Sequence, residues 1–425
     1  ASFGLKPGGD NGTYLQRWPY RAVKVDVASL VAELRGAKAR KLVYGQEFFV
    51  VPSATTDTIS GELVFGGVAG ANSAAKQQFA KNVVAFYIPG GNMDQPWMQA
   101  LQTGFIAAMS GGARGVVFIL DPLFKSEAVG TVVTQLQGAS TPLPILAIRY
   151  DVARDWLKQY SVELENARLS NDPAALGKAS FALSTGKTEQ SNPPNVVGIL
   201  EGSDPVLKNT YVVYSAHMDH VGVGQPNEKG DSIYNGADDD ASGTTAVIEI
   251  AQAFTSMKER PKRSLIFLLV RGEEKGLFGS AYFVASPPVP AKQMIADINI
   301  DMIGRNSPDT TVAIGQDYSS LGSTMQTIVK AHPELKLTVA PDLWPEENLF
   351  VRSDHFNFAR AEIPAIFFTS GLHADYHKPS DEPATIDTDK LARTARLLFY
   401  LGYDLANTAT APTWTETGLK VIKGQ

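Results

Sequence analysis

The chain has 425 residues, 44% of them hydrophobic and 19% charged, with a formal net charge of −6 at pH 7 and no cysteine. This length predicts one large or two ordinary domains with a substantial core. Without cysteine the chain has no disulfide, no thiol nucleophile and no thiolate metal ligand. The acidic balance, without a run of Lys or Arg, argues against nucleic acid or an anionic membrane as a partner and leaves peptide-like substrates open.

The longest apolar runs, such as LIFLLV at 265–270, are far shorter than the roughly 20 residues that a membrane-spanning helix needs. No membrane span is predicted. The first residues, ASFGLKPGGDNGTY, do not have the pattern of a signal peptide. We expect a mature chain, secreted or periplasmic, from which a signal peptide has been removed.

The predicted elements change character along the chain. Residues 1–42 are ambiguous, since KVDVASLVAEL fits either a helix or two strands. Residues 43–157 contain short β runs broken by Gly, Pro and Ser, with one helix at 96–110. Residues 163–194 are polar and alternate weakly, which is typical of connecting strands or a linker.

From residue 195 onward, apolar strands alternate with helices. Strands are predicted at 211–217, 264–270, 296–303 and 363–370, and helices at 242–256, 276–285, 319–332 and 388–407. Fully apolar strands between helices predict an α/β fold, with a mixed, mostly parallel sheet flanked by helices on both faces.

Ligands of such a sheet bind beyond the carboxyl ends of the strands, so the residues that follow each strand are the candidates for a site. His217 ends the first of these strands, and Asp219 lies where it can orient the imidazole. Glu273 and Glu274 follow the next strand. One of them can bind a metal while the other acts as a general base, although carboxylates are also favoured at any helix N-terminus.

Asp301 ends an otherwise apolar strand, where a carboxylate is costly to bury unless it is paired or bound to a metal. The loop after the last strand, GLHADYHKPSD at 371–381, contains His373, Tyr376 and His377. Loops after sheet strands are where sites are commonly built. Among the six histidines, only His332 falls in what reads as an ordinary helix.

Three aspartates stand in a row in NGADDDASG, just before a predicted helix. Nitrogen and oxygen ligands without sulfur suit Zn, Mn or Co, and the carboxylates outnumber the three protein ligands that one catalytic zinc needs. Two metals that share a bridging carboxylate would use them all. Asp239, Glu274 and Asp301 with one hydroxide would neutralise two divalent cations.

Six segments, AHMDHVGVG, NGADDDASG, RGEEKGLFGS, NIDMIG, SDHFNF and YHKPSD, resemble in this order the co-catalytic (di-zinc) aminopeptidase family of metallo-exopeptidases. Its members include leucyl-type aminopeptidases, glutamate carboxypeptidase and glutaminyl cyclase. The resemblance implies that the chain hydrolyses the N-terminal peptide bond of a peptide substrate. It also implies two Zn²⁺ ions, with Mn²⁺ or Co²⁺ as substitutes, and an attacking water that bridges them.

The same resemblance assigns roles to residues of this chain. His217 and Asp301 would hold one zinc, Glu274 and His377 the other, and Asp239 would bridge the two. Glu273 would be the general base, Asp219 would orient His217, and Tyr376 would polarise the substrate carbonyl.

The resemblance also implies a cis peptide bond between Asp239 and Asp240. Asp240 and Ser242 lie where the following helix needs acceptors for its first free N–H groups. Asp238 is left without an assigned role.

The β-rich region resembles the protease-associated domain that many family members carry as an insertion, and GLKPGGDNGTY resembles the stretch that leads into it. Three segments are therefore expected. Residues 1–42 form a connection or the N-terminal part of the peptidase domain, residues 43–175 form the protease-associated-like domain, and residues 176–425 form the catalytic domain. Because a helix precedes this stretch in the family, we expect either a truncated or processed chain or another segment in its place.

Three alternatives stay open. A zinc carboxypeptidase would need a cation near the metals to hold a terminal carboxylate, and Arg271, Arg305 and Arg352 are candidates. A glutaminyl cyclase usually needs one zinc, so the complete ligand set argues against it. A receptor that has lost its metals would not retain every ligand position. The sequence predicts neither the oligomeric state nor the preferred terminal residue.

Overall fold

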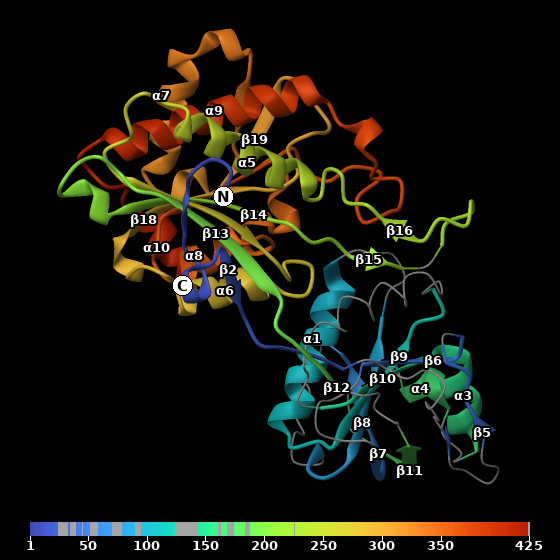
Figure 1. Cartoon of the computed structure of the whole chain (residues 1–425). Helices are drawn as coiled ribbons and strands as arrows, with labels where there is room; N and C mark the ends of the chain where they lie inside the picture. The colour runs from blue at the N-terminus through green and yellow to red at the C-terminus, as the bar shows by residue number, and fades with distance from the viewer. Residues whose placement is uncertain are drawn as a thin grey trace. The chain divides into compact units, whose positions relative to one another are not determined.

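A computed structural model of the chain describes residues 1–23, 33–34, 40–44, 46–51, 58–69, 79–89, 95–123, 143–159, 163–167, 174–182, 188–224 and 226–423 (Figure 1). The chain forms two compact units, one of Ala1–Pro19 with Asn192–Gln425 and the other of Tyr20–Ser191. Strand β3 (Tyr20–Val23) pairs with β12 (Thr188–Ser191), so the second unit begins and ends at this pair. The boundaries expected after residues 42 and 175 both fall inside it.

The first unit is built on a nine-stranded sheet in the order β1-β13-β17-β14-β18-β21-β19-β20, with β2 also paired to β13. Its four central strands, β17, β14, β18 and β21, are parallel, whereas β13 and β19 run antiparallel to their central neighbours. The predicted mixed, mostly parallel sheet is confirmed. Its strands are β1 (Lys6–Pro7), β2 (Leu15–Arg17), β13 (Pro194–Leu200), β14 (Tyr211–His217), β17 (Ser264–Val270), β18 (Met294–Ile300), β19 (Thr310–Ile314), β20 (Thr338–Ala340) and β21 (Ala365–Thr369).

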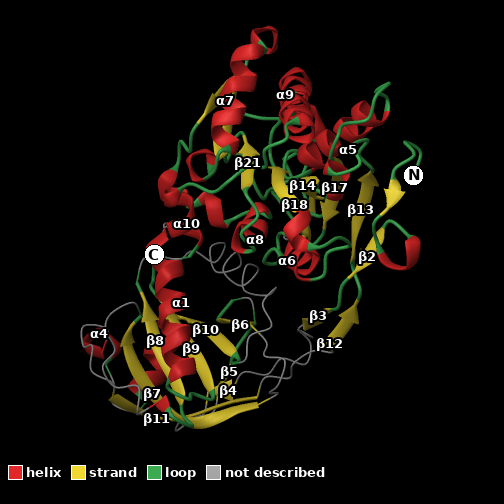
Figure 2. Ribbon diagram, turned by 90° about the vertical axis from the view of Figure 1, so that its left-hand side faces the viewer, coloured by secondary structure: helices red, strands yellow, loops and turns green. Residues whose placement is uncertain are grey.

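Helices cover both faces of this sheet (Figure 2). Helices α5 and α9 pack on one face, and α6 and α8 pack on the other. The helices of the unit are α5 (Ala241–Thr255), α6 (Phe278–Ala285), α7 (Leu321–Ala331), α8 (His355–Arg360), α9 (Thr388–Asn407) and α10 (Glu416–Ile422), and a hairpin of β15 (Gly222–Val223) and β16 (Ile233–Tyr234) follows β14.

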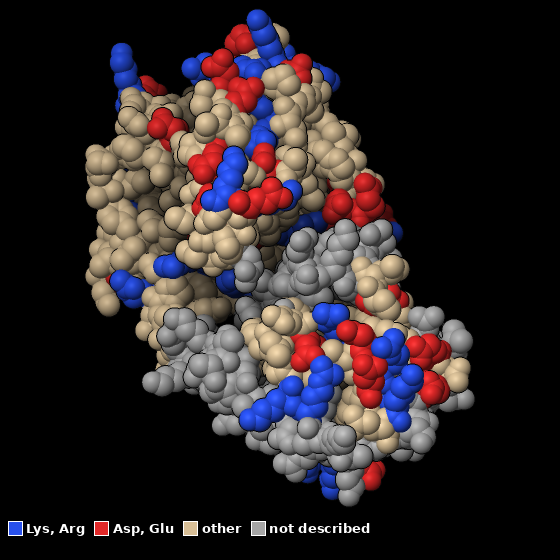
Figure 3. Space-filling model, turned by 90° about the vertical axis from the view of Figure 1, so that its right-hand side faces the viewer, with Lys and Arg blue, Asp and Glu red and all other residues tan. Residues whose placement is uncertain are grey.

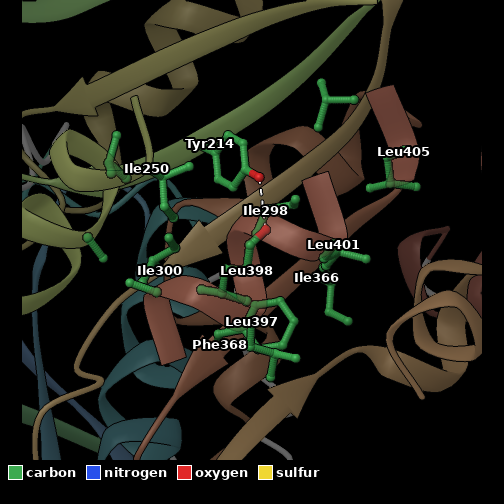
Figure 4. Packing of buried hydrophobic residues seen from close by; sticks show 14 of the residues in the cluster. Tyr214, Ile250, Ile298, Ile300, Ile366, Phe368, Leu397, Leu398, Leu401 and Leu405 are labelled. Atoms are coloured by element: carbon green, nitrogen blue, oxygen red, sulfur yellow. Dashed lines mark hydrogen bonds between the residues drawn. The ribbon is translucent and has the colours of Figure 1, made fainter. Parts of the chain in front are cut away.

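Strand β14 shows why the sheet needs helices on both sides. Successive side chains of a strand point to opposite faces, so Val212 and Tyr214 pack with α5 and α9, whereas Val213 packs with α6 and α8. The Tyr214 hydroxyl donates a hydrogen bond of 2.8 Å to the Leu398 carbonyl (Figure 4). A Cβ atom on Gly402 would lie 1.7 Å from that hydroxyl, so glycine lets α9 approach the strand closely.

The second unit is a six-stranded sheet in the order β11-β7-β8-β9-β10-β6. Strands β7 to β10 are parallel neighbours, and β11 and β6 close the two edges in the antiparallel direction. Hydrophobic clusters lie on both faces. Its elements are β4 (Glu33–Leu34), β5 (Arg40–Lys41), β6 (Phe48–Val51), β7 (Thr58–Val68), β8 (Val83–Ile88), α1 (Gln95–Ser110), β9 (Gly115–Leu120), β10 (Ile145–Arg149), α3 (Tyr150–Lys158), α4 (Leu164–Ala167) and β11 (Ala174–Ala182).

Strand β11 lies in the segment expected to form connecting strands or a linker, and it forms an edge strand of this sheet. On the face of the molecule seen in Figure 3, Lys and Arg side chains are interleaved with Asp and Glu side chains. Within the described ranges, the chain has no helix that is both long enough and apolar enough to cross a membrane.

Candidate metal centre

The carboxyl ends of the parallel strands bring the predicted metal ligands together. His217 is the last residue of β14, Asp301 directly follows β18, and Glu274 follows β17. Asp239 precedes α5, and His377 lies in the loop after β21. Parallel neighbours end at the same edge of a sheet, so segments distant in sequence meet there.

The Asp239 carboxylate lies between two histidines. Its Oδ1 is 3.1 Å from Nε2 of His217, and its Oδ2 is 3.2 Å from Nε2 of His377. Asp301 Oδ1 lies 3.5 Å from the same nitrogen of His217, and Glu274 Oε2 lies 3.1 Å from that of His377. Two adjacent groups of potential ligands therefore share one carboxylate.

His220 belongs to one of these groups, although the sequence gives it no role. Its Nδ1 is 2.7 Å from Glu274 Oε1 and 3.7 Å from Asp239 Oδ2, and its ring meets that of His377 edge-on. The motif HMDH places this second histidine three residues after His217, and this spacing is the signal in the sequence that a second histidine could reach the site.

The donor set fits a metal ion of the zinc type. Nε2 of His217, Nε2 of His377, Oε1 of Glu274 and Oδ1 of Asp301 are buried and make no hydrogen bond to the described part of the chain. A buried polar atom without a partner costs free energy, and nitrogen and carboxylate oxygen atoms at this spacing are what zinc binds. Cations would therefore satisfy these atoms.

Ionised carboxylates and protonated histidines also stabilise one another in this cluster. Burial tends to raise the pKa of Asp239, but its contacts with His217 and His377 outweigh burial and hold the pKa below its ordinary value. Burial likewise opposes the charge of Glu274, whose pKa its histidine partners lower to about 2. Burial disfavours the charge of His377, yet its contacts with Asp239 and Glu274 raise its pKa to about 9.

Glu273 and Tyr376 line a pocket next to these ligands. The pocket wall includes Glu273, Tyr376, Leu349, Phe367, Leu372 and Arg352. Burial raises the pKa of the Glu273 carboxyl well above its ordinary value. The Tyr376 ring stacks on His377 with ring centroids 3.9 Å apart, and burial also raises the pKa of its hydroxyl.

Asp219 contacts His217 through its main chain rather than its side chain. Nδ1 of His217 is 2.8 Å from the main-chain carbonyl oxygen of Asp219. The Asp219 carboxylate instead accepts hydrogen bonds of 2.8 Å from the Gly272 amide, which precedes the two glutamates. The side chain therefore ties the loop after β14 to the loop after β17.

The three consecutive aspartates have three different environments. The Asp239–Asp240 peptide bond is cis, as the resemblance implies. Asp240 caps α5 by accepting from the Gly243 amide at 2.8 Å, whereas the Ser242 hydroxyl donates to the Asp238 carbonyl.

Asp238 is a buried, hydrogen-bonded residue behind the site. Its Oδ1 accepts from the Gly304 amide at 2.6 Å, and its Oδ2 is 3.3 Å from His373 Nε2. The buried carboxylate of Asp381 accepts from the amides of both Asp238 and Asp239, at 3.0 and 3.2 Å. The YHKPSD segment thus supplies both the ligand candidate His377 and the carboxylate that holds the aspartate turn.

Residues 195–402 match the sequence profile of peptidase family M28. The match covers just under half of the chain, and over these residues the chain is similar to family M28. The leupeptin-inactivating enzyme 1 of Streptomyces exfoliatus is 31% identical to this chain over 185 residues, covering 43% of this chain and 37% of that protein. A probable leucine aminopeptidase of Arthroderma benhamiae is 26% identical over 223 residues, covering 50% of this chain and 58% of that protein. The chain thus spans less than two thirds of the length of these relatives.

Solved structures of two aminopeptidases resemble this chain over most of its length. The aminopeptidase from Aneurinibacillus sp. strain AM-1 matches with a TM-score of 0.62 at 18% identity, covering 93% of this chain and 85% of that chain. A zinc aminopeptidase from Bacillus subtilis matches with a TM-score of 0.53 at 18% identity, covering 93% and 86%. At this identity, the likeness establishes the fold of the chain.

Proposed function

We propose that this chain is a zinc aminopeptidase that hydrolyses the N-terminal peptide bond of peptides and binds two metal ions. One observation carries the proposal: the Asp239 carboxylate presents one oxygen to each of two ligand groups. His217 and Asp301 would hold one ion, and Glu274 and His377 the other. The match to family M28, a relative named as a probable leucine aminopeptidase and the structural likeness to a zinc aminopeptidase support it.

The residues around the ions have separate tasks. Zinc, when bound, supplies a Lewis acid and lowers the pKa of a water molecule towards 7. Glu273 takes a proton from the attacking water and returns it to the leaving amine, a role that its raised pKa suits. Tyr376 donates a hydrogen bond to the carbonyl oxygen of the substrate, and the Asp219 carbonyl fixes the orientation of His217.

Removal of metal tests the proposal most directly. Purified protein should hydrolyse leucine p-nitroanilide, because Leu349, Phe367 and Leu372 give the pocket an apolar wall. A chelator should abolish this activity, and added zinc should restore it. Atomic absorption should find two equivalents of zinc per chain when activity is restored. Activity that survives complete metal removal, or full activity at one equivalent, would contradict the di-zinc proposal.

A peptide with an N-terminal glutamine tests the cyclase alternative. Formation of pyroglutamate without release of a free amino acid would show that the protein is a cyclase.

The carboxypeptidase alternative depends on a free cation near the ligands. Arg305 is bound to Asp375 and Thr385, each at 2.7 Å. Arg352 lines the pocket, with Nη1 held 3.0 Å from the Glu347 carboxylate. Arg352 is therefore the arginine to test.

Arg352→Gln should leave the cleavage of leucine p-nitroanilide within about twofold of the unchanged protein, because this substrate has no carboxylate. Cleavage of a free dipeptide should fall by up to about fivefold relative to its C-terminal amide, the range of a partly exposed ion pair. Glu347→Gln is the matched control, and it should shift this ratio in the opposite direction because it frees Arg352. A carboxypeptidase would instead cleave only substrates with a free C-terminus and would lose this activity in Arg352→Gln. Comparing kcat/KM for the two substrates separates these outcomes.

A further inference from the structure

A stripe of polar side chains runs through the core of the first unit. Asp297 and Asn299 alternate along β18 and lie on the same face as Asp301, while Ser215 lies beside Asn299 on β14. All are at most 6% exposed. The residues that alternate with them, such as Ile298 and Ile300, belong to the apolar cluster of the opposite face (Figure 4).

Short hydrogen bonds connect this stripe to the metal centre. The Ser353 hydroxyl donates to Asp301 Oδ2 at 2.7 Å. Nδ2 of Asn299 donates to the Ser353 oxygen at 2.8 Å. The Ser215 hydroxyl lies 2.9 Å from Asn299 Oδ1 and also 2.9 Å from Asp297 Oδ1.

The number of available hydrogens fixes the direction of this chain. A serine hydroxyl has one hydrogen. Ser353 uses its hydrogen on the Asp301 carboxylate, so Asn299 must present its NH₂ group to Ser353 and its carbonyl oxygen to Ser215. That oxygen needs the hydrogen of Ser215. The contact between Ser215 and Asp297 then requires a hydrogen from Asp297.

The surroundings of Asp297 favour its neutral form. Its Oδ2 is buried without a hydrogen bond to any residue in the described ranges. The charged group that faces it, Asp354, is itself a buried carboxyl. Burial raises the pKa of Asp297 well above its ordinary value, and Asp354 raises it further. An ionised carboxylate here would leave an unpaired charge in the core, which is costly.

We propose that Asp297 is held as a neutral carboxylic acid, and that its hydrogen bond to Ser215 begins a one-way chain that ends on Asp301. Asp297, Ser215 and Asn299 are positioning residues: they keep the Ser353 hydrogen directed at Asp301 and so orient this carboxylate. The effect on metal binding rests on the function proposed above, whereas the protonation of Asp297 does not.

Infrared spectroscopy tests the protonation state without metal or substrate. The difference spectrum of the wild-type protein minus Asp297→Asn, recorded near pH 7, should contain the C=O band of a protonated carboxylic acid. A carboxylate band in its place would overturn the proposal. The asparagine of this variant can donate the same hydrogen bond through its NH₂ group, so the variant should fold.

The pH dependence of stability gives a second readout. In the unfolded chain Asp297 is ionised above its ordinary pKa near 4, so folding of the wild-type protein takes up a proton at neutral pH. Wild-type stability should therefore fall relative to Asp297→Asn as pH rises above that value. The Tm of the wild-type protein minus that of Asp297→Asn should therefore decrease from pH 5 to pH 8. A constant difference would mean that Asp297 is ionised in the folded state.

Metal affinity tests the positioning role. Without Ser215, the Asn299 amide can turn its oxygen to Ser353 and draw the hydrogen away from Asp301. Ser215→Ala should raise the zinc Kd about 3- to 10-fold, and Ser353→Ala about 10- to 100-fold, the range for groups that orient ligands. Asp297→Asn should stay within about twofold. Ser264→Ala is the matched control, because Ser264 is equally buried and bonds only the main chain at Gly202 and Lys208. Equal zinc Kd values for Ser215→Ala and Ser264→Ala would overturn this role.

Discussion

Glu273→Gln is expected to lower kcat about 10²- to 10⁴-fold, the contribution of a well-placed general base, without changing the amount of bound zinc. Glu273 lines the pocket beside Asp239 and Asp301 but belongs to neither group of potential ligands. Glutamine retains the shape of the side chain and cannot accept the proton. The measurement is kcat on leucine p-nitroanilide, together with zinc content by atomic absorption.

Glu274→Gln is the matched control, because this neighbouring glutamate lies 3.1 Å from His377 and 2.7 Å from His220. The control should lose zinc as well as activity. The two variants thus distinguish the roles of the adjacent glutamates: Glu273→Gln loses activity but keeps zinc, whereas Glu274→Gln loses both. A fully active Glu273→Gln protein would refute the assignment of the base, whatever the metal content of either variant.

Asp239→Ala is expected to abolish metal binding by the site and all metal-dependent activity. Replacing groups that only orient a ligand already costs about 10- to 100-fold in metal affinity, and the loss of a carboxylate shared by both groups should cost more. Circular dichroism should first establish that the variant folds, because Asp239 is the buried partner of His217 and His377 and its removal lowers stability.

Thermal unfolding with and without zinc measures this effect. Zinc should raise the Tm of the wild-type protein, since a ligand that binds only the folded state stabilises it. Asp239→Ala should show no zinc-dependent shift. Asp389→Ala, which changes an exposed aspartate in the first turn of α9, should behave as the wild-type protein does. A zinc shift of normal size in Asp239→Ala would mean that this carboxylate is not a ligand.

Much of the fold follows from local pattern. Apolar strands such as SLIFLLV must be covered on both faces, so their alternation with helices predicts the mixed sheet. The limits of the second unit do not follow, because the pairing of β3 with β12 joins residues far apart in the sequence. The pairing of β11 with β7 likewise does not follow from the weakly alternating pattern of its segment, because an edge strand needs little apolar character.

The sequence by itself determined which residue types follow the strands and precede the helices, and its resemblance to the aminopeptidase family picked out His217, Asp239, Glu274, Asp301 and His377 among them. Only the tertiary structure decided which atoms meet there. It brought His220 to Glu274, gave the contact with His217 to the carbonyl of Asp219, and joined Asp301 through Ser353 to a polar stripe in the core. The physical reason is that strand periodicity fixes the face on which a side chain lies. A hydrogen bond, in contrast, requires a donor–acceptor distance accurate to a few tenths of an ångström, and only packing between distant segments sets that distance.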